Sequence, residues 1–569
     1  MNERSKLPSP PRPELILFLA CFVIVLAPLA LRGTSCGQDF DFHLQSWMGA
    51  AQQWRQGVFY PHWFASANYQ AGEPRFVFYP PFSWMLGAFL CIFFPSTWAP
   101  PFLFVAICLL AMGAACYKMA CEWMPPAGAA LTASLYIVSP YIFFVIYERS
   151  ACGELLAAAW LPLLLLYALR DKSSMPQLAL IIAALWLTDA PAAVMGCYAL
   201  AVIVLVAAIA EHRWTLLVRA ASATALGLGL AAVYIVPAVY EQRWVEIDRA
   251  IMPGMRIQDS FLFEHTGMAY HDQVLRTASW IATSMLIATL IAAIGSFRVR
   301  KSQPLRAPLI ALAAIIAFLQ FPISKFLWNV APELLFLQFP WRWLLVLGLI
   351  LAIFAVLLLE TINKRRTLNA VLVLAFAAVF CVHAWRHFWL FCDDEDNVRA
   401  QIATLHGNGF EGTDEYTPAH ADNAAIQQNL APVRVVSSPD GDEADSSIEE
   451  NPDWQPRESD LVPAIIQFRR AHIEHITVDI QTAQPGYAVF RLMDYPAWRV
   501  RVNNKLVTAI EHRDDGLLTI PIPAGTSTIE VQYSTTRDMW AGRIVSLISF
   551  LIWGVLCFVP NPSRPAEVP

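Results

Sequence analysis

The chain has 569 residues and a net charge of −6 at pH 7, and 57% of its residues are hydrophobic whereas only 15% are charged. Soluble globular proteins carry about 25% charged residues, so this composition excludes an ordinary soluble protein. The mild negative charge gives no reason to expect a nucleic-acid partner. Apolar runs of about 20 residues, the length that crosses a bilayer as a helix, recur along most of the chain. We therefore predict an integral membrane protein.

The first apolar run, residues 15–31, follows a short tail that contains Arg4, Lys6 and Arg12. The run is long, no small-residue cleavage site is convincing, and many more apolar runs follow. We therefore predict a retained first helix with a cytoplasmic N-terminus rather than a signal peptide.

Further apolar runs predict the remaining membrane helices. They lie at about 82–95, 101–121, 127–147, 154–169, 176–188, 190–210, 215–238, 281–297, 307–322, 341–360, 367–391 and 541–559. Basic loops near residues 170–172, 213, 298–301 and 364–366 face the cytoplasm by the positive-inside rule. The loops at 32–81, 239–280 and 323–340 then lie outside. Counting from both ends gives conflicting sides between residues 82 and 147, so one run there is a half-helix, a re-entrant segment or not a membrane helix at all. The shortest candidate is 82–95, and we expect about 12 crossings.

Residues 392–540 have a different composition. They are polar and include an acidic run, 437–453, that we interpret as a mobile loop. Alternating segments broken by turn residues then predict the strands of a small β-sandwich. These segments are "HITVDIQT", "GYAVFRLMDY", "WRVRVNN", "LLTIPIP" and "STIEVQYS".

The predicted architecture therefore has three parts. Residues 1–391 form a polytopic α-helical membrane domain with a first outer loop at 32–81. Residues 392–540 form an extracytoplasmic β-rich domain. Residues 541–569 form the final membrane helix and a cytoplasmic tail. The eleven cysteines lie mostly inside apolar runs without a CxxC pair, and we interpret them as small buried hydrophobic residues.

The first outer loop opens with Asp39, Asp41 and His43 in "GQDFDFHLQSWMGAAQQWRQG". Apolar residues from Phe42 onward recur at helical spacing, which predicts a short helix in the membrane interface, with its tryptophans at headgroup depth. The two acids are also typical of a helix N-terminus, where they would only cap the helix. The aromatic segment 57–82 that follows has no core of its own, so we expect it to cover a cavity at the outer face.

Two further charged clusters occur at the same predicted depth. Glu148, Arg149 and Glu154 separate two apolar runs, and Gln338 and Arg342 begin another. The first cluster is also compatible with an ion pair at a helix end, and Arg342 with an interfacial arginine. Carboxylates can deprotonate a hydroxyl or bind a cation, and arginines can bind a phosphate. Together they indicate a reaction on a lipid-linked phosphate.

A third acid, Asp189, lies between two apolar runs in "LWLTDAPAA". A turn residue ahead of Pro191 explains it equally well, and we keep it outside the predicted site.

The sequence resembles the GT-C superfamily of polytopic glycosyltransferases, and more closely the bacterial membrane proteins described as 6-pyruvoyl-tetrahydropterin synthase-related. The residues that carry the resemblance are "DFDFHL", "GVFYPHW", "EPRFVFYPPF", "YERSACGELLA", "QFPWRW" and the late "YPAWRVRVNN". They span most of the chain in order. The sequence has no His-rich zinc site of the soluble synthase, and "LTDAPAA" differs from the His- or Asn-containing form expected in this group.

The resemblance implies a GT-C-like fold and an inverting transfer of a sugar from a polyprenyl-phosphate donor to an extracytoplasmic acceptor. Asp39 or Asp41, with Asp41 preferred, would be the catalytic acid of the first outer loop, acting as general base or helping to hold Mg²⁺ or Mn²⁺. Arg149 and Arg342 would neutralise the phosphate. A groove beside the half-helix 82–95 would hold the lipid. The location implied is the bacterial inner membrane.

The remaining substrate contacts would come from polar residues near these two arginines. They are His43, Glu148, Glu154 and Gln338.

Two other functions fit parts of the sequence. Intramembrane charges and broken helices also occur in lipid or glycan transporters, although we find no convincing internal repeat. A non-catalytic envelope protein that binds glycan through the β-rich domain is the other alternative.

Overall fold

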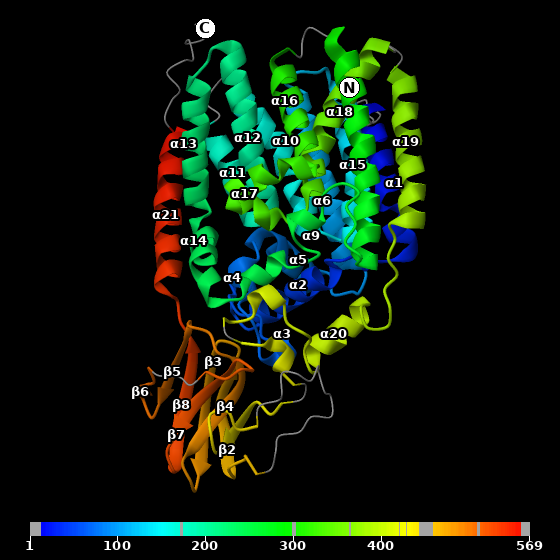
Figure 1. Cartoon of the computed structure of the whole chain (residues 1–569). Coiled ribbons are helices and arrows are strands. Elements are labelled where there is room, and N and C mark those ends of the chain that lie inside the picture. Colours follow the sequence, from blue (N-terminus) through cyan, green and yellow to red (C-terminus); the bar gives the residue numbers. More distant parts are fainter. Residues whose placement is uncertain are drawn as a thin grey trace, which may run out of the picture.

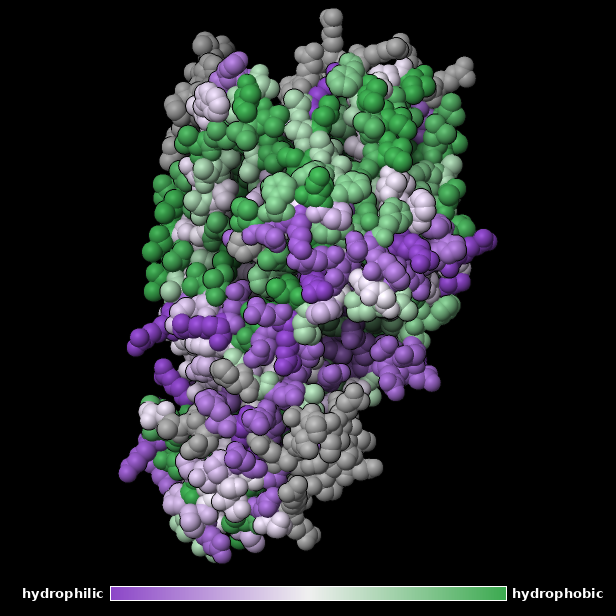
Figure 2. Space-filling view, viewed as in Figure 1, coloured by the Kyte–Doolittle hydropathy of each residue, from purple (hydrophilic) through white to green (hydrophobic). Residues whose placement is uncertain are grey.

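The computed structural model describes residues 13–170, 175–298, 303–362, 366–419, 421–427, 430–442, 459–508 and 512–558. The helices form a bundle, and the strands form a separate layer below one end of it (Figure 1). A hydrophobic band covers the helical part, and hydrophilic side chains gather below it and over the junction with the strands (Figure 2). This distribution is the one expected of a protein that spans a bilayer.

Within the described residues, nine helical segments are long and apolar enough to cross a membrane, or up to eleven if two bent helix pairs each count as one span. The straight spans are α1 (Pro13–Arg32), α6 (Ala99–Ala120), α12 (Ala190–Glu211), α15 (Ala269–Gly295), α18 (Leu344–Ile362), α19 (Arg366–His387) and α21 (Arg537–Phe558). These bounds follow the predicted apolar runs closely except for α15, which begins twelve residues before the predicted run 281–297 and includes the end of the predicted outer loop 239–280.

Each of the two remaining spans consists of shorter helical segments that follow one another directly. One runs through α7 (Pro126–Ile137), α8 (Pro140–Phe144) and a π-helical turn at Val145–Arg149. The other joins α9 (Cys152–Ala157) to α10 (Trp160–Leu169). The break between these two spans holds Arg149, and π-helical turns of this kind are frequent at functional sites.

The two bent pairs add irregular backbone. The axis turns by 74° between α13 (Thr215–Leu230) and α14 (Ala232–Glu241), and by 102° between α16 (Gln303–Leu319) and the segment that contains α17 (Lys325–Val330).

Helices α5 (Pro81–Phe93) and α11 (Met175–Thr188) are apolar but shorter. At 13 residues, α5 is only about 20 Å long. The hydrocarbon core is about 30 Å thick, so α5 agrees with the predicted half-helix.

Helix α2 (Phe40–Arg55) forms where the amphipathic pattern predicts it, but its environment differs from the prediction. Trp47 is only 1% exposed and stacks on Phe104 at 4.6 Å. Gly87 of α5 makes this packing possible, because a Cβ there would lie 2.0 Å from the Trp47 ring. The prediction that the tryptophans of this helix lie at lipid headgroups is therefore wrong for Trp47, which is covered by protein.

The polar C-terminal region contains α20 (Val398–His406) and eight strands. The strands are β1 (Val433–Val436), β2 (Ala464–His472), β3 (His475–Thr482), β4 (Gly486–Met493), β5 (Trp498–Val502), β6 (Lys505–Leu506), β7 (Leu517–Ile522) and β8 (Gly525–Tyr533). One sheet has the order β1-β4-β7 and the other β2-β3-β8-β5-β6, and all pairs are antiparallel. Four of the five predicted alternating segments contain one of these strands, and the fifth, "STIEVQYS", covers all of β8 except its first two residues.

The strands share a hydrophobic core with other parts of the chain. Val435, Phe490 and Ile529 from the two sheets belong to the same buried cluster as Trp63 of the first outer loop and Tyr234 of α14. The short helices α3 (Ala67–Gln70) and α4 (Arg75–Phe78) belong to this loop. The strand layer is therefore packed onto the membrane part rather than attached to it only by its ends.

A disulfide joins Cys36 in the first outer loop to Cys392, five residues after the end of α19. The interpretation of the cysteines as buried hydrophobic residues is wrong for this pair, whereas the other nine are free thiols. These two cysteines lie outside the apolar runs, which is the signal that sequence analysis did not use.

Some predicted segments lie outside the described residues. They are residues 443–453 of the acidic loop, and Lys172, Arg300, Lys301, Lys364 and Arg365 of the basic loops.

Candidate functional site

The main chain brings the first outer loop against the break between two spans. The amide of Gln38 donates to the carbonyl of Glu148 at 3.2 Å, and that of Asp39 donates to the carbonyl of Arg149 at 2.9 Å. A Cβ on Gly37 would lie 2.5 Å from the Glu148 carbonyl oxygen, so only glycine allows this approach. These contacts fix the position of the Asp39 side chain.

Arg149 is the centre of the site. Its side chain is 1% exposed, and its guanidinium donates through Nη2 to Asp39 Oδ2 at 3.0 Å and through Nη1 to Glu154 Oε2 at 2.7 Å. Asp39 remains 37% exposed, whereas Glu154 is buried. A charge is tolerated at this depth only with such partners, and here one guanidinium bonds two carboxylates.

Glu154 is held from a second side by Tyr141, whose hydroxyl donates to Oε1 at 2.7 Å. Asp189 caps α12 by accepting from the Ala192 amide at 2.8 Å, as a turn residue would. Its other oxygen lies 2.9 Å from the position of a Cβ on Gly153, so Asp189 packs against the turn that carries Glu154. Asp189 therefore borders the cluster while serving as a helix cap.

Arg342 completes the cluster. Its Nε lies 3.8 Å from Glu154 Oε2, and its side chain is 11% exposed. Within the residues that the structure describes, its guanidinium makes no hydrogen bond. The Phe339 ring lies against both arginines, 5.7 Å from the Arg149 guanidinium carbon and 5.3 Å from that of Arg342. Arg342 therefore adds the second positive charge that balances the two carboxylates, while its hydrogen-bond donors remain unused among the described residues.

Asp41 lies two residues after Asp39, in the first turn of α2. Its side chain is exposed and accepts a hydrogen bond from the Phe42 amide at 2.7 Å. Surrounding protein nevertheless raises the pKa of Asp41 through desolvation. The nearby charge of Asp39 raises the pKa further, and the Phe42 amide and Arg75 oppose both effects. Asp41 is thus an accessible carboxylate with a raised pKa.

His43 points into the protein instead. Its Nδ1 lies 2.6 Å from the Tyr79 hydroxyl, which lies 2.9 Å from the Ser83 hydroxyl. Burial lowers the pKa of His43 to about 4, so the ring is neutral at neutral pH. This chain of hydrogen bonds joins α2 to Tyr79 and to Ser83 of α5, and it does not include the arginine cluster.

Two predicted residues have other contacts. Gln338 donates through Nε2 to the carbonyl of Ala250 at 2.8 Å, and this hydrogen bond joins it to the helical turn Ile247–Ile251. Glu148 accepts the Gln38 amide through its main-chain carbonyl, and its carboxylate has no hydrogen bond to a described residue. Of the predicted set, the structure brings Asp39, Arg149, Glu154 and Arg342 into one cluster.

Sequence analysis missed a second buried ion pair. Arg75 donates through Nε to Glu73 Oε1 at 2.5 Å and through Nη2 to Thr413 Oγ1 at 2.9 Å, and both charged side chains are at most 2% exposed. The Arg75 guanidinium also lies 4.5 Å from the Phe42 ring. The pair ties α2 to the C-terminal region. Its sequence signal is two charges within the otherwise aromatic "EPRFVFYPPF".

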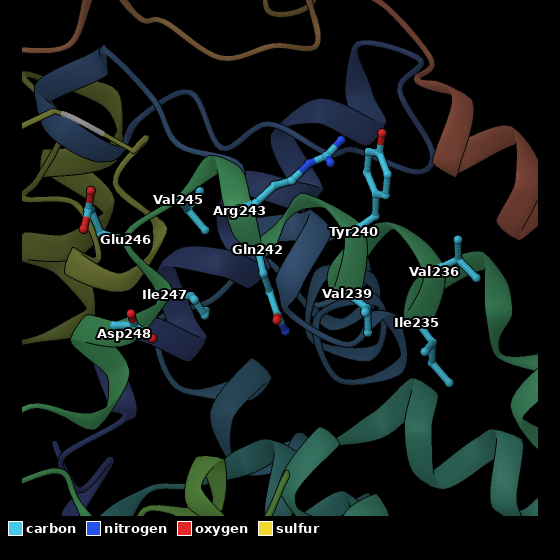
Figure 3. Close-up of a pocket in the computed structure, with 10 residues that line it drawn as sticks. All are labelled: Ile235, Val236, Val239, Tyr240, Gln242, Arg243, Val245, Glu246, Ile247 and Asp248. Atoms are coloured by element: carbon cyan, nitrogen blue, oxygen red, sulfur yellow. The ribbon is translucent and has the colours of Figure 1, made fainter. Parts of the chain in front are cut away.

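A cavity of about 850 Å³ lies beside α14 and the turn that follows it (Figure 3). Ile235, Val236 and Val239 line its apolar part on the helix, and the polar residues come from the end of the helix and the segment that follows it (Figure 3). Their full set is Tyr240, Gln242, Arg243, Glu246 and Asp248. The helical turn Ile247–Ile251 continues from this lining to Ala250, which Gln338 holds four residues before Arg342.

A smaller cavity of about 250 Å³ lies at the end of α5, between α2 and α20. Leu44, Met48 and Cys91 line it. This is the position of the groove predicted beside the half-helix.

The residues do not fit a dedicated metal site. Among the residues that the structure describes, no three His, Cys, Asp or Glu side chains come close enough together to hold one ion. Asp39, one of the two predicted ligands, is paired with Arg149. Divalent cations such as Mg²⁺ need several oxygen ligands, so we derive no step through a metal.

A comparison with protein families matches residues 76–388, more than half of the chain, to the 6-pyruvoyl-tetrahydropterin synthase related domain, described as a membrane protein. The chain belongs to this family. The match confirms the family expected from the sequence motifs, and family membership and the apolar helices identify a multi-pass membrane protein. No curated protein sequence matches the chain.

Several solved structures of glycosyltransferase chains are similar in shape to this family member. The arabinofuranosyltransferase AftD from Mycobacteria is 12% identical with a TM-score of 0.44, and the match covers 92% of this chain and 57% of that chain. ArnT from Cupriavidus metallidurans, solved with undecaprenyl phosphate, is 12% identical with a TM-score of 0.30. That match covers 72% of this chain and 91% of the ArnT chain. The chain thus spans less than two thirds of the length of AftD. At such similarity the function has to come from the site itself.

Proposed function

We propose that the protein is a membrane glycosyltransferase of the GT-C type. It transfers a sugar from a polyprenyl-phosphate donor to an acceptor on the outer side of the bacterial inner membrane. The observation that carries the proposal is Arg342, a nearly buried guanidinium without a hydrogen-bond partner among the described residues, next to the Asp39–Arg149–Glu154 cluster. Buried donors are normally satisfied, and an unsatisfied buried arginine is suited to an anionic ligand.

Arg342 would bind the donor phosphate. Its planar guanidinium can form two parallel hydrogen bonds to phosphate oxygens, which a lysine cannot do. The charge on the leaving phosphate increases in the transition state, so this contact would strengthen as the sugar departs. Such electrostatic contacts contribute about 2.7–4 kcal/mol per donor. Arg149 would act through position, by holding Asp39 and adding positive charge behind the phosphate.

Asp41 would act as the general base. It is accessible, it has no ion-pair partner among the described residues, and its raised pKa favours proton acceptance. The carboxylate would take the proton of an acceptor hydroxyl while that oxygen attacks the anomeric carbon from the face opposite the phosphate. The bond from the anomeric carbon to the phosphate oxygen breaks, polyprenyl phosphate leaves with the electron pair, and the configuration at the sugar inverts.

The lipid chain would lie along α14. The 850 Å³ cavity has an apolar helical wall and polar residues beside it, and the turn that follows this lining is hydrogen-bonded at Ala250 by Gln338, four residues before Arg342. We prefer it to the groove predicted beside α5, because that cavity is smaller and is covered by α20.

Two observations support the outward orientation of the site. The Cys36–Cys392 disulfide lies beside the loop that carries Asp39, and disulfides persist in oxidising compartments outside the cytoplasm. The start of α1 and the end of α21 lie at the opposite end of the bundle from the strands (Figure 1). This arrangement supports cytoplasmic N- and C-termini.

The test is product formation by the full-length protein in vesicles, with a panel of polyprenyl-phosphate-linked hexoses and pentoses as donors. Asp41→Asn is expected to abolish transfer with the donor still bound, because only the base is lost. Arg342→Ala is expected to weaken donor use, and Asp39→Asn to reduce transfer by misplacing the loop. Wild-type product levels from both Asp variants would exclude the transferase mechanism and would favour an envelope protein that binds glycan.

A further inference from the structure

A third cavity, of about 360 Å³, lies where the strand layer meets the last membrane helix. Its lining comes from β5, from the end of β8, from the connection to α21 and from the first turn of α21. The lining residues are Arg499, Arg501, Glu530, Gln532, Tyr533, Ser534, Thr535 and Trp540. The volume is within the range of small-ligand sites, about 300–1,000 Å³.

The strand geometry gathers positive charge in this cavity. Arg499 and Arg501 are two residues apart on β5, so their side chains project from the same face of the sheet. They lie opposite Gln532 and Glu530 of β8 in the register of the two strands. The alternate residue Val500 points into the shared core.

The charges in the cavity do not balance. Glu530 lies 3.5 Å from Arg501 Nη1 and 3.0 Å from His475 Nε2, so its carboxylate is already shared. Arg499 is exposed and makes no hydrogen bond or ion pair to any residue in the described part of the chain. The cavity therefore carries a guanidinium available to an anion.

The depth of the cavity identifies the kind of anion. Trp540 is 56% exposed, three residues after α21 begins, and the Arg543 guanidinium carbon lies 5.6 Å from its ring centre. Exposed tryptophans at the start of a membrane helix lie at headgroup level, and a paired arginine one turn farther in reaches toward the same level. A ligand in this cavity would thus be at the depth of lipid phosphates.

We propose that this cavity binds the phosphate of an anionic phospholipid in the outer leaflet. Arg499 donates to the phosphate oxygens, with Arg501 next to it, and Trp540 packs against the glycerol and upper acyl region. Because the strand layer shares its core with the first outer loop, a bound lipid would also fix this loop relative to the bilayer. The site is separate from the arginine cluster and does not depend on the transferase proposal.

The experiment compares full-length variants in detergent by native mass spectrometry, with added phosphatidylglycerol or phosphatidylcholine as probes. Wild type is expected to retain phosphatidylglycerol selectively. Arg499→Gln is expected to weaken its binding about tenfold, the effect of one lost charge-assisted hydrogen bond. Trp540→Leu should weaken it too. Arg469→Gln is the matched control, because Arg469 is 64% exposed in the same sheet but lies on β2, outside the cavity, and this variant should bind as wild type.

Two outcomes would overturn the proposal. In one, Arg499→Gln and Trp540→Leu retain phosphatidylglycerol as wild type does. In the other, soluble glycerol phosphate displaces the lipid at equal concentration, which would make the cavity a site for a soluble anion. Arg499 is exposed and unpaired, so its replacement should leave the melting temperature in detergent unchanged, which separates lost binding from misfolding.

Discussion

Arg149 donates through Nη2 to Asp39 Oδ2 at 3.0 Å, although the two residues are 110 positions apart in the chain. The same guanidinium bonds Glu154, five residues later, across the break between two spans. One buried cation therefore joins the first outer loop to the membrane bundle. We therefore propose that Arg149 positions this loop and that Arg342 is the arginine that binds substrate.

Removal of Arg149 should destabilise the protein strongly. Arg149→Met leaves the buried Glu154 with only the longer, 3.8 Å contact to Arg342 as charge compensation, and breaking a buried pair in this way costs about 3–5 kcal/mol. The measurement is the unfolding midpoint of the purified protein in detergent. Arg256→Gln, which removes an exposed ion pair to Asp259, is the control and should cost at most about 1 kcal/mol.

A second substitution distinguishes charge from packing in this experiment. Glu154→Gln combined with Arg149→Met removes the buried negative charge and should recover part of the lost stability. If the double variant is no more stable than Arg149→Met alone, the buried carboxylate is not the cause.

The pH dependence of transfer should report Asp41. A general base must be ionised, so activity is present above its pKa and is lost as pH falls through it. Because burial and Asp39 raise the pKa of Asp41, the acid limb of kcat/KM should lie at higher pH than for an ordinary aspartate, whose pKa is about 3.9. Asp39→Asn removes a neighbouring negative charge and should move the limb to lower pH. An unchanged limb in this variant would argue against Asp41 as the titrating group.

His43 should make the stability of the fold depend on pH. Its folded-state pKa is about 4, against 6.5 for the ordinary side chain, so the unfolded chain binds more protons between these values. The contribution of neutral His43 is therefore complete above about pH 6.5 and is lost as pH falls toward about 4. Comparing unfolding midpoints of wild type and His43→Gln over this window tests the effect. Equal pH slopes in the two proteins would contradict it.

Much of the fold could be predicted because hydrophobic pattern determines it locally. The run at 190–210 became α12 at Ala190–Glu211, and "HITVDIQT" became β3 at His475–Thr482, since each pattern has the period of its element. Whether the apolar side of α2 faces lipid or the protein core could not be predicted in this way. Trp47 suits lipid headgroups and a protein core equally well, and Gly87 on another helix decides between them.

The site was only partly predictable for a related reason. Charges in apolar sequence must pair, which is why Arg149, Glu154 and Arg342 could be selected as candidates. Which carboxylate pairs with which arginine depends on the approach of residues 37–39 to residues 148–149, and that approach depends on a glycine without a Cβ. Tyr141 gave no signal, because a tyrosine among aromatic neighbours has no pattern of its own.

The Cys36–Cys392 disulfide should stabilise the outer end of the molecule. It links positions 356 residues apart, and loss of such a cross-link typically costs about 2–5 kcal/mol because the unfolded chain gains freedom. A Cys36→Ser/Cys392→Ser variant should therefore unfold at a lower temperature than wild type in detergent. Reductant should lower the midpoint of wild type toward that of the variant and leave the variant unchanged. Cys121→Ser, which removes an exposed free thiol, is the matched control and should respond to reductant as wild type does. A wild-type midpoint that is unaffected by full reduction, verified by thiol labelling, would show that the cross-link does not hold the loop that carries Asp39.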